Sequence, residues 1–201
     1  MSKKKKEIKE EKNPELEKEA FYLSKKTKVK GTRSMVRGKV LEVLFAHEVS
    51  GEDIEELFQH IFFRIFKFES EEPKEHKLLT REEIYELEAD IPIEWDEEDI
   101  EFARELIKHT LRTKTFAIES IKQTIENWEF DRITMIDRII LEMAIAELLN
   151  FPDISPKITI NEAIEVAKQY STDKSGIFVN GLLDTLLKRF IKEGLISKKE
   201  N

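Results

Sequence analysis

The chain has 201 residues, of which 40% are hydrophobic, 38% are charged and none is cysteine, so it can bury a core but excludes disulfides and thiolate zinc sites. No apolar stretch follows the lysines behind Met1, and no run approaches the roughly 18 apolar residues of a membrane span. We therefore expect a soluble, cytoplasmic protein that makes no contact with a membrane. The net charge of −8 argues against a general nucleic-acid binder.

The charges are divided unevenly along the chain. Residues 1–39 hold 14 Lys/Arg and 6 Glu, whereas the remainder holds 20 basic and 36 acidic groups. Residues 69–101 alone contain 15 Asp/Glu. This asymmetry favours a basic end that binds an anion and an acidic belt elsewhere on the protein. The alternative, in which both are only solvated segments, stays open.

The first elements follow from hydrophobic spacing and from capping residues. Residues 1–13 are expected to be a disordered lysine-rich tail, and residues 14–27 a short helix. The spacing predicts a helix over Thr32–Glu48 with Thr32 as its N-cap. A second, aromatic-rich helix is predicted from Ser50, with Asp53 completing a capping box.

The middle of the chain is predicted to be a charged connection followed by long helices. Residues 69–95 form the connection, with a brief helix after Thr80. A long helix is expected over Asp96–Asn127, because apolar residues recur along one face. The next is predicted over Thr134–Leu149, with Asp137 completing its capping box.

Two further helices complete the prediction. Pro152 and Pro156 should stop the preceding helix, so the next one is expected over Ile160–Tyr170. The last is predicted from Ser175 to just before Gly194, which is a typical C-terminal cap. No segment shows sustained strand alternation, and the predicted class is all-α.

The sequence shows no arrangement of residues typical of catalysis. It lacks a glycine-rich phosphate loop and a nucleophile elbow. The histidines have no second ligand at metal spacing: His47, His60, His76 and His109. The acids at 97–99 are explained by the start of a helix, where negative charge is favourable. We expect no enzymatic activity, no catalytic residue, no metal and no cofactor.

Two segments resemble the NusB family. Residues 128–148 are similar to its penultimate core helix, with matches at Arg132, Asp137, Arg138, Ala144, Glu147 and Leu148. The run INEAIEVAK at 160–168, followed by FVNG at 178–181 and by Asp184, is similar to the family's C-terminal signature. Residues 32–50 add a weaker match to the family's first helix, which includes Arg33, Arg37, Leu44 and Phe45.

The resemblance implies a NusB-like bundle of about seven helices. The folded, RNA-binding domain would span 32–196, with a basic, largely disordered extension at 1–31 and an acidic insert at about 69–95. The implied function is transcription antitermination, in which the protein binds boxA-type single-stranded RNA of ribosomal RNA operons. It would do so together with the ribosomal protein NusE, within the antitermination complex of RNA polymerase.

The predicted RNA contacts are Arg33, Arg37, Lys39, Phe45, Lys168, Lys174, Phe178 and Asn180. Basic groups attract phosphates and aromatic rings stack on bases, although burial in the core is the alternative for both phenylalanines. Arg33 and Arg37 lie four residues apart and share a helix face. As exposed charges, they should be replaceable without loss of folding. The predicted rim for a NusE-like partner is Glu101, Glu105 and His109.

The sequence departs from the family at some of these positions. Ser34 and Met35 stand where arginine is common, Lys174 where an acid is common, and Ile177 where lysine is common.

Two other functions are considered. The same fold resembles the N-terminal domain of ribosomal RNA cytosine methyltransferases, which would require a Rossmann-like domain that the sequence lacks. The other is a helical scaffold that binds protein only.

Overall fold

The computed structural model describes residues 29–63, 93–125 and 130–196. Apart from Val29, these belong to one compact unit made of 30–64 and 93–201. The helices described are α1 (Arg33–Ser50), α2 (Ile54–Phe62), α4 (Glu97–Thr124), α5 (Met135–Asn150), α6 (Pro156–Tyr170) and α7 (Ser175–Lys192). The short elements are β1 (Val29–Lys30), β2 (Ile93–Glu94) and the 3-10 turn η2 (Phe130–Arg132). The predicted all-α class is confirmed.

Several predicted segments fall outside the described residues. These are the lysine-rich tail at 1–13, the short helix at 14–27, the helix after Thr80 and nearly all of the acidic insert at 69–95.

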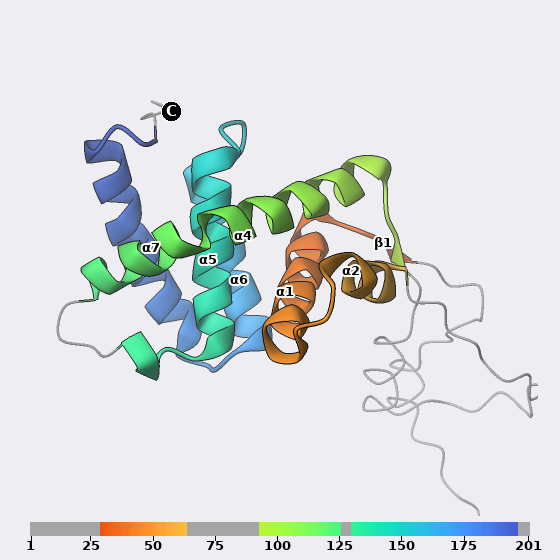
Figure 1. The fold of residues 1–201 in the computed structure, drawn as a ribbon. Coiled ribbons are helices and arrows are strands. Elements are labelled where there is room, and N and C mark those ends of the chain that lie inside the picture. The colour runs from red at the N-terminus through yellow and green to blue at the C-terminus, as the bar shows by residue number, and fades with distance from the viewer. Residues whose placement is uncertain (1–28, 64–92, 126–129, 197–201) are drawn as a thin grey trace, which may run out of the picture. The chain divides into compact units, whose positions relative to one another are not determined.

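The helices surround α5, which packs against α1, α4, α6 and α7. In Figure 1, α5, α6 and α7 run side by side and α4 crosses them. Every residue from Ile139 to Leu148 is buried, because α5 has neighbours on all sides. The prediction of a core helix over 134–149 is therefore confirmed.

Thr32 and Thr134 cap the helices that follow them, as predicted, but Asp137 does not complete a capping box, because its carboxylate accepts from Ser175 instead. The Thr32 hydroxyl accepts from the Met35 amide at 3.3 Å, and the Thr134 hydroxyl accepts from the Asp137 amide at 3.1 Å. The capping box at Ser50 is wrong, because Ser50 is the last residue of α1. Gly51 follows in the left-handed region, with φ of 72°, and ends that helix.

The cap of α2 is instead Asp53, whose carboxylate accepts from the amides of Glu55 and Glu56. The predicted start of α6 is also wrong, because the helix begins at Pro156 and not at Ile160. Proline is tolerated in the first turn because that position needs no amide hydrogen bond.

Gly38 lies where a side chain of another helix comes close to the backbone of α1. A Cβ added at Gly38 would lie 2.7 Å from the Tyr170 hydroxyl, so α1 and α6 pack tightly there. At Gly181, by contrast, nothing lies within 4 Å of an added Cβ, so no other helix crosses closely there. The two short strands, which the sequence did not predict, pair with each other, and the Gly31 amide donates to the Glu94 carbonyl at 2.8 Å.

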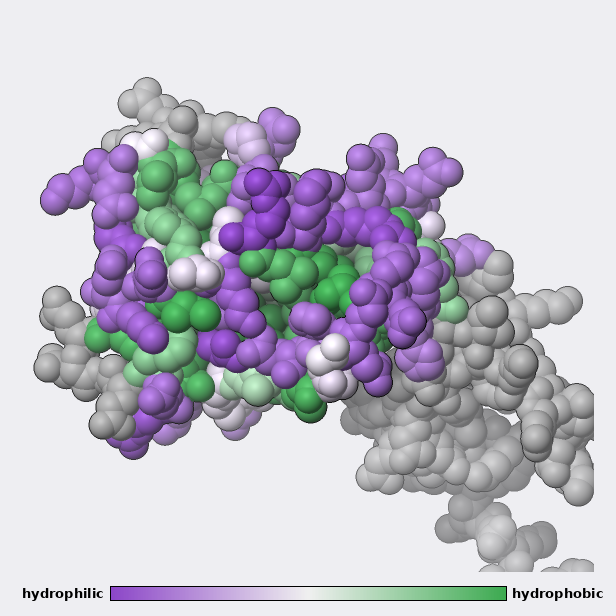
Figure 2. Space-filling view, in the orientation of Figure 1, coloured by the Kyte–Doolittle hydropathy of each residue, from purple (hydrophilic) through white to green (hydrophobic). Residues whose placement is uncertain are grey.

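An apolar cavity of about 340 Å³ opens between α2 and α4. Ile54, Phe58, Ile107 and Leu111 line it, together with Glu55, Arg104, Lys108 and Arg112. Figure 2 shows apolar surface beside α4 that is framed by hydrophilic side chains. Among the described residues, no helix has the length and apolar character needed to cross a membrane.

Candidate nucleic-acid interface

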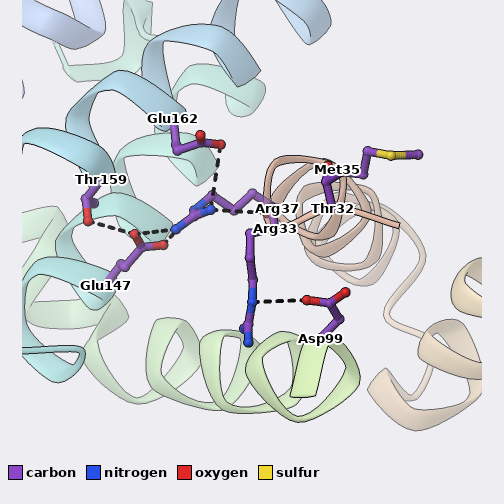
Figure 3. A network of polar contacts seen from close by, with 8 residues as sticks. All are labelled: Thr32, Arg33, Met35, Arg37, Asp99, Glu147, Thr159 and Glu162. Carbon is purple, nitrogen blue, oxygen red and sulfur yellow. Dashed lines mark hydrogen bonds and ion pairs between the residues drawn. The ribbon is translucent and has the colours of Figure 1, made fainter. Parts of the chain in front are cut away.

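The structure places Arg37 inside the protein (Figure 3). Its side chain is 7% exposed, and its Nε and Nη2 atoms donate to the Glu147 carboxylate, both at 2.8 Å. Its Nη1 donates to the Arg33 carbonyl at 3.1 Å and lies 3.6 Å from a Glu162 carboxylate oxygen. The prediction that Arg37 is an exposed charge is therefore wrong, because its donors are engaged within the protein.

The partner of this arginine is held in place from a third helix. The Thr159 hydroxyl of α6 donates to the same Glu147 carboxylate at 2.6 Å (Figure 3). Arg37, Glu147 and Thr159 thus join α1, α5 and α6 in one buried network. The signal in the sequence is Glu147 itself, an acid at the end of an apolar run, which requires a buried cationic partner.

Arg33 and Lys39 remain closer to solvent, and both are paired. The Arg33 side chain is 43% exposed, and its Nε lies 3.0 Å from a carboxylate oxygen of Asp99 (Figure 3). Its guanidinium also lies 4.5 Å from the centre of the Phe102 ring. Lys39 lies 2.8 Å from a carboxylate oxygen of Glu42 on its own helix.

The other predicted RNA residues lie mainly where α1 ends, where α6 ends and where α7 begins. Figure 1 shows these helix ends together with the start of α5 at the lower end of the bundle. Phe45 on α1 is 37% exposed, and Lys174 is exposed just before α7. Lys168 is exposed near the end of α6, and its stem would contact a Cβ at Gly176.

Phe178 and Asn180 both lie on α7 but face different directions. Phe178 is half-buried, and Asn180 is exposed. Two residues apart on a helix, they point to nearly opposite sides, so they cannot both face the same ligand group.

A cavity of about 150 Å³ opens at this end of the bundle. It is lined by Arg132, Ile133, Asp137, Thr172, Lys174, Ser175 and Phe178. Arg132 and Lys174 are exposed at this cavity. The starts of α5 and α7 also meet here, and helix starts attract anions. We call this cavity the α5–α7 pocket.

Charged side chains link α1, α4 and α5 beside Phe45. Glu48, one turn beyond Phe45, contacts Lys114 and lies 2.9 Å from the Arg138 guanidinium. The hydrogen bond from Lys114, supported by Arg138, lowers the pKa of Glu48. Next to them Glu142 is only 3% exposed, and burial raises its pKa to about 7 although Arg138 and Lys114 act in the opposite direction.

The predicted partner residues share one side of α4. Glu101 is exposed, and Glu105 lies 2.9 Å from Lys108 and 3.4 Å from His109. The His109 ring also packs edge-on against Phe151, with the ring centres 5.6 Å apart. The cavity between α2 and α4 adjoins this side, and the sequence did not predict it, because Leu111 falls in the apolar pattern of the helix although it is 38% exposed. Among the described residues, no group of three or more His, Asp or Glu side chains could hold a metal ion.

Comparison with known proteins gives consistent results. Residues 34–188 match the model of the NusB family. The transcription antitermination protein NusB of Salinibacter ruber is 44% identical over 108 residues, which cover 54% of this chain and 68% of that protein. The protein of the same name from Clostridium botulinum is 30% identical over 155 residues, which cover 77% of this chain and 99% of that one.

Solved structures share the fold. NusB of T. maritima is 31% identical, with a TM-score of 0.58, covering 80% of this chain and 93% of that one. A complex of the antitermination factors NusB and NusE with double-stranded RNA contains a chain with a TM-score of 0.57. The alignment covers 78% of this chain and 96% of that one. Because the two are only 22% identical, the likeness shows the fold alone. From the match over residues 34–188 and the clostridial relative, this chain belongs to the NusB family.

Proposed function

We propose that the chain is a transcription antitermination factor that binds boxA-type single-stranded RNA in transcripts of ribosomal RNA operons. The observation that carries the proposal is that a NusB-family chain has, at one end of its bundle, a pocket with cations at its mouth and an aromatic ring in its wall. In this proposal residues 32–196 form the RNA-binding domain, and the protein acts in the cytoplasm.

The α5–α7 pocket supplies the elements that single-stranded RNA requires. Arg132 and Lys174 are exposed and can each meet a phosphate, and the starts of two helices add to the attraction. Phe178 offers a ring for stacking on a base, and the exposed Phe45 offers a second. Because the whole chain carries a charge of −8, the attraction for phosphates must come from local cations such as these.

The structure changes the role that we propose for the N-terminal arginines. Arg37 is a structural residue, since its guanidinium is buried against Glu147. Arg33 and Lys39 can still exchange their carboxylate partners for phosphates, because both ion pairs are partly exposed. Lys168 and Asn180 are retained as contacts at the edge of the surface.

A NusE-like ribosomal protein is the proposed partner, within the antitermination complex of RNA polymerase. A structural neighbour of this chain occurs in a complex with NusE, which supports the proposal. We propose that Glu101, Glu105 and His109 form part of the contact surface. Exposed acids there would steer a basic ribosomal protein toward α4.

RNA binding is tested with the full chain and a fluorescent boxA-type oligonucleotide, with and without the NusE-like protein, by anisotropy at several salt concentrations. We expect binding that exceeds that of a scrambled oligonucleotide and that strengthens with the partner. Replacing Arg132 and Lys174 by alanine should lower affinity and reduce the salt slope by roughly 0.7 for each phosphate that is no longer neutralised. Lys188→Ala is the matched control, because Lys188 is an exposed lysine paired with Asp184 elsewhere on α7.

Equal binding of the boxA-type and scrambled oligonucleotides, alone and with the partner, would refute the proposal. The apolar cavity between α2 and α4 favours one second candidate, a scaffold that binds protein only. Partner binding without any RNA binding would support that scaffold.

A further inference from the structure

The cavity between α2 and α4 is a groove that runs along α4. Its α4 wall is formed by residues three and four positions apart, which are Arg104, Ile107, Lys108, Leu111 and Arg112. One turn of α2, from Ile54 to Phe58, forms the other wall. Because a helix rises about 1.5 Å per residue, the wall from Arg104 to Leu111 is roughly 11 Å long, which is also the span from residue i to residue i+7 of a second helix. The groove therefore has the length that the apolar anchors of a bound helix require.

The floor of this groove is apolar. Phe58 is 1% exposed and Ile107 is 4% exposed, whereas Leu111 beside them is 38% exposed. Figure 2 shows apolar surface beside α4 that hydrophilic side chains frame. An apolar side chain that fills the groove would remove Leu111 from water, and burial of apolar area stabilises a complex.

The rim of the groove is basic, although the whole chain carries a charge of −8. Arg104 is held in place, because its guanidinium pairs with Glu55 and lies 4.2 Å from the centre of the Phe58 ring. Lys108 pairs with Glu105 on its own helix, and a ligand carboxylate can replace this exposed contact. Arg112 is exposed and makes no ion pair among the described residues. Lys108 and Arg112 can therefore receive acids that a ligand brings to the rim.

We propose that the groove binds an acidic amphipathic helix of another protein. Its apolar side chains would pack against Ile54, Phe58 and Leu111, and its carboxylates would meet Lys108 and Arg112. Helices bind apolar grooves through anchors on one face, and the cations at the rim select acids on either side of that face. The groove adjoins the side of α4 that we propose for the NusE-like protein, so the helix and that protein should exclude each other. Only this exclusion rests on the proposed function.

The first test uses a synthetic peptide of about 16 residues, long enough to form a helix. It carries leucine at i, i+4 and i+7, with glutamate on both sides of that stripe. We expect saturable binding to the full chain in fluorescence anisotropy, and the affinity should fall as salt is added, because the rim charges are exposed. A peptide with lysine in place of each glutamate should bind roughly tenfold more weakly or worse. An acidic peptide of the same composition, with its leucines spread around the helix, should bind as weakly.

Variants of the protein test the floor and the rim separately. Leu111→Asp places a charge on the apolar wall and should lower the affinity for the acidic peptide roughly tenfold or more. Lys108→Glu with Arg112→Glu should abolish the preference for glutamate over lysine in the peptide. The matched control is Lys122→Glu with Lys157→Glu, which changes the charge equally at exposed residues outside the groove and should keep the preference. All these positions are exposed, so the urea unfolding midpoints should stay close to that of the parent.

Several results would overturn the proposal. These are no saturable binding of the acidic peptide, or equal binding by the parent and both groove variants. Self-association of the parent that Leu111→Asp abolishes would assign the groove to a second copy of this chain. Peptide binding that appears only after the acids of residues 82–90 are replaced by amides would assign it to that segment. None of these results concerns RNA, so the proposed function would stand.

The exclusion is tested by adding the NusE-like protein to the complex of the full chain with the labelled acidic peptide. We expect that protein to displace the peptide. Simultaneous binding of both would overturn the exclusion and leave the groove as a site for an acidic helix.

Discussion

Glu142 should make the stability of this protein fall as the pH rises. It lies on α5, is 3% exposed, and has one carboxylate oxygen without a hydrogen bond among the described residues. The Arg138 guanidinium is 3.6 Å away, and Lys114 and Glu48 face it from α4 and α1. Burial outweighs both cations and raises the pKa of Glu142 from 4.5 to about 7.

The sign follows from proton uptake. Between pH 4.5 and pH 7 the folded protein keeps Glu142 protonated while the unfolded chain has lost that proton. The folded state therefore binds more protons, and the free energy of unfolding decreases as the pH rises through this window. For the pKa values above, the decrease between about pH 5 and about pH 8 is roughly 2.5 kcal/mol.

Glu142→Gln isolates this effect because the amide is neutral at every pH. Urea unfolding of the parent and the variant is compared across this pH range. We expect the variant to gain roughly 2.5 kcal/mol relative to the parent as the pH rises. Glu48→Gln is the opposite control, because the lowered pKa of Glu48 gives stability that is lost as the pH falls. Parallel pH profiles for the parent and Glu142→Gln would refute the reasoning.

Other substitutions test the packing and the partner surface. Arg37→Ala should destabilise the fold by about 3–5 kcal/mol, because both Arg37 and its partner Glu147 are buried. Arg33→Ala should cost about 1 kcal/mol or less, because the Arg33 side chain is 43% exposed. Equal urea midpoints for the two variants would contradict this. Gly38→Ala should cost about 1–3 kcal/mol, since its methyl group meets the Tyr170 hydroxyl, and Gly181→Ala should be neutral or stabilising by up to about 1 kcal/mol. The melting temperatures of the Gly38→Ala and Gly181→Ala variants, compared with that of the parent, test both expectations. Leu111→Asp should lower the affinity for the NusE-like partner at least several-fold, as measured by calorimetry. Unchanged affinity would exclude the cavity between α2 and α4 from the contact.

Local signals predicted the elements well because their causes are local. Thr32 and Thr134 begin helices by accepting an amide within the next three residues, and this pattern is visible in the sequence. The wrong prediction at Ser50 has a local cause too. Gly51 ends α1 and Asp53 begins α2, so Ser50 belongs to the end of the first helix and not to the start of the second. Pro156 was taken as a barrier, although the same residue can begin a helix.

The site was less predictable because its contacts join distant parts of the chain. Helical spacing showed that Arg33 and Arg37 share a face, but it could not show that Glu147 lies opposite one of them, 110 residues away. Likewise, the carboxylate of Asp137 meets Ser175, 38 residues later. Composition indicated a basic end and an acidic belt, whereas the pocket depends on a few side chains whose positions only the packed helices define.

The three buried acids of α5 connect the stability of the bundle with its proposed function. Asp137, Glu142 and Glu147 are spaced five residues apart, so they point in three different directions around the helix. Glu147 is fully engaged by α1 and α6, Glu142 is only partly compensated, and Asp137 retains a free oxygen. Because each acid meets a different neighbour, a rotation of α5 would break all three sets of contacts. The same helix is thus fixed firmly near its C-terminal end by Glu147, whereas Asp137 near its start keeps one oxygen without a hydrogen bond among the described residues.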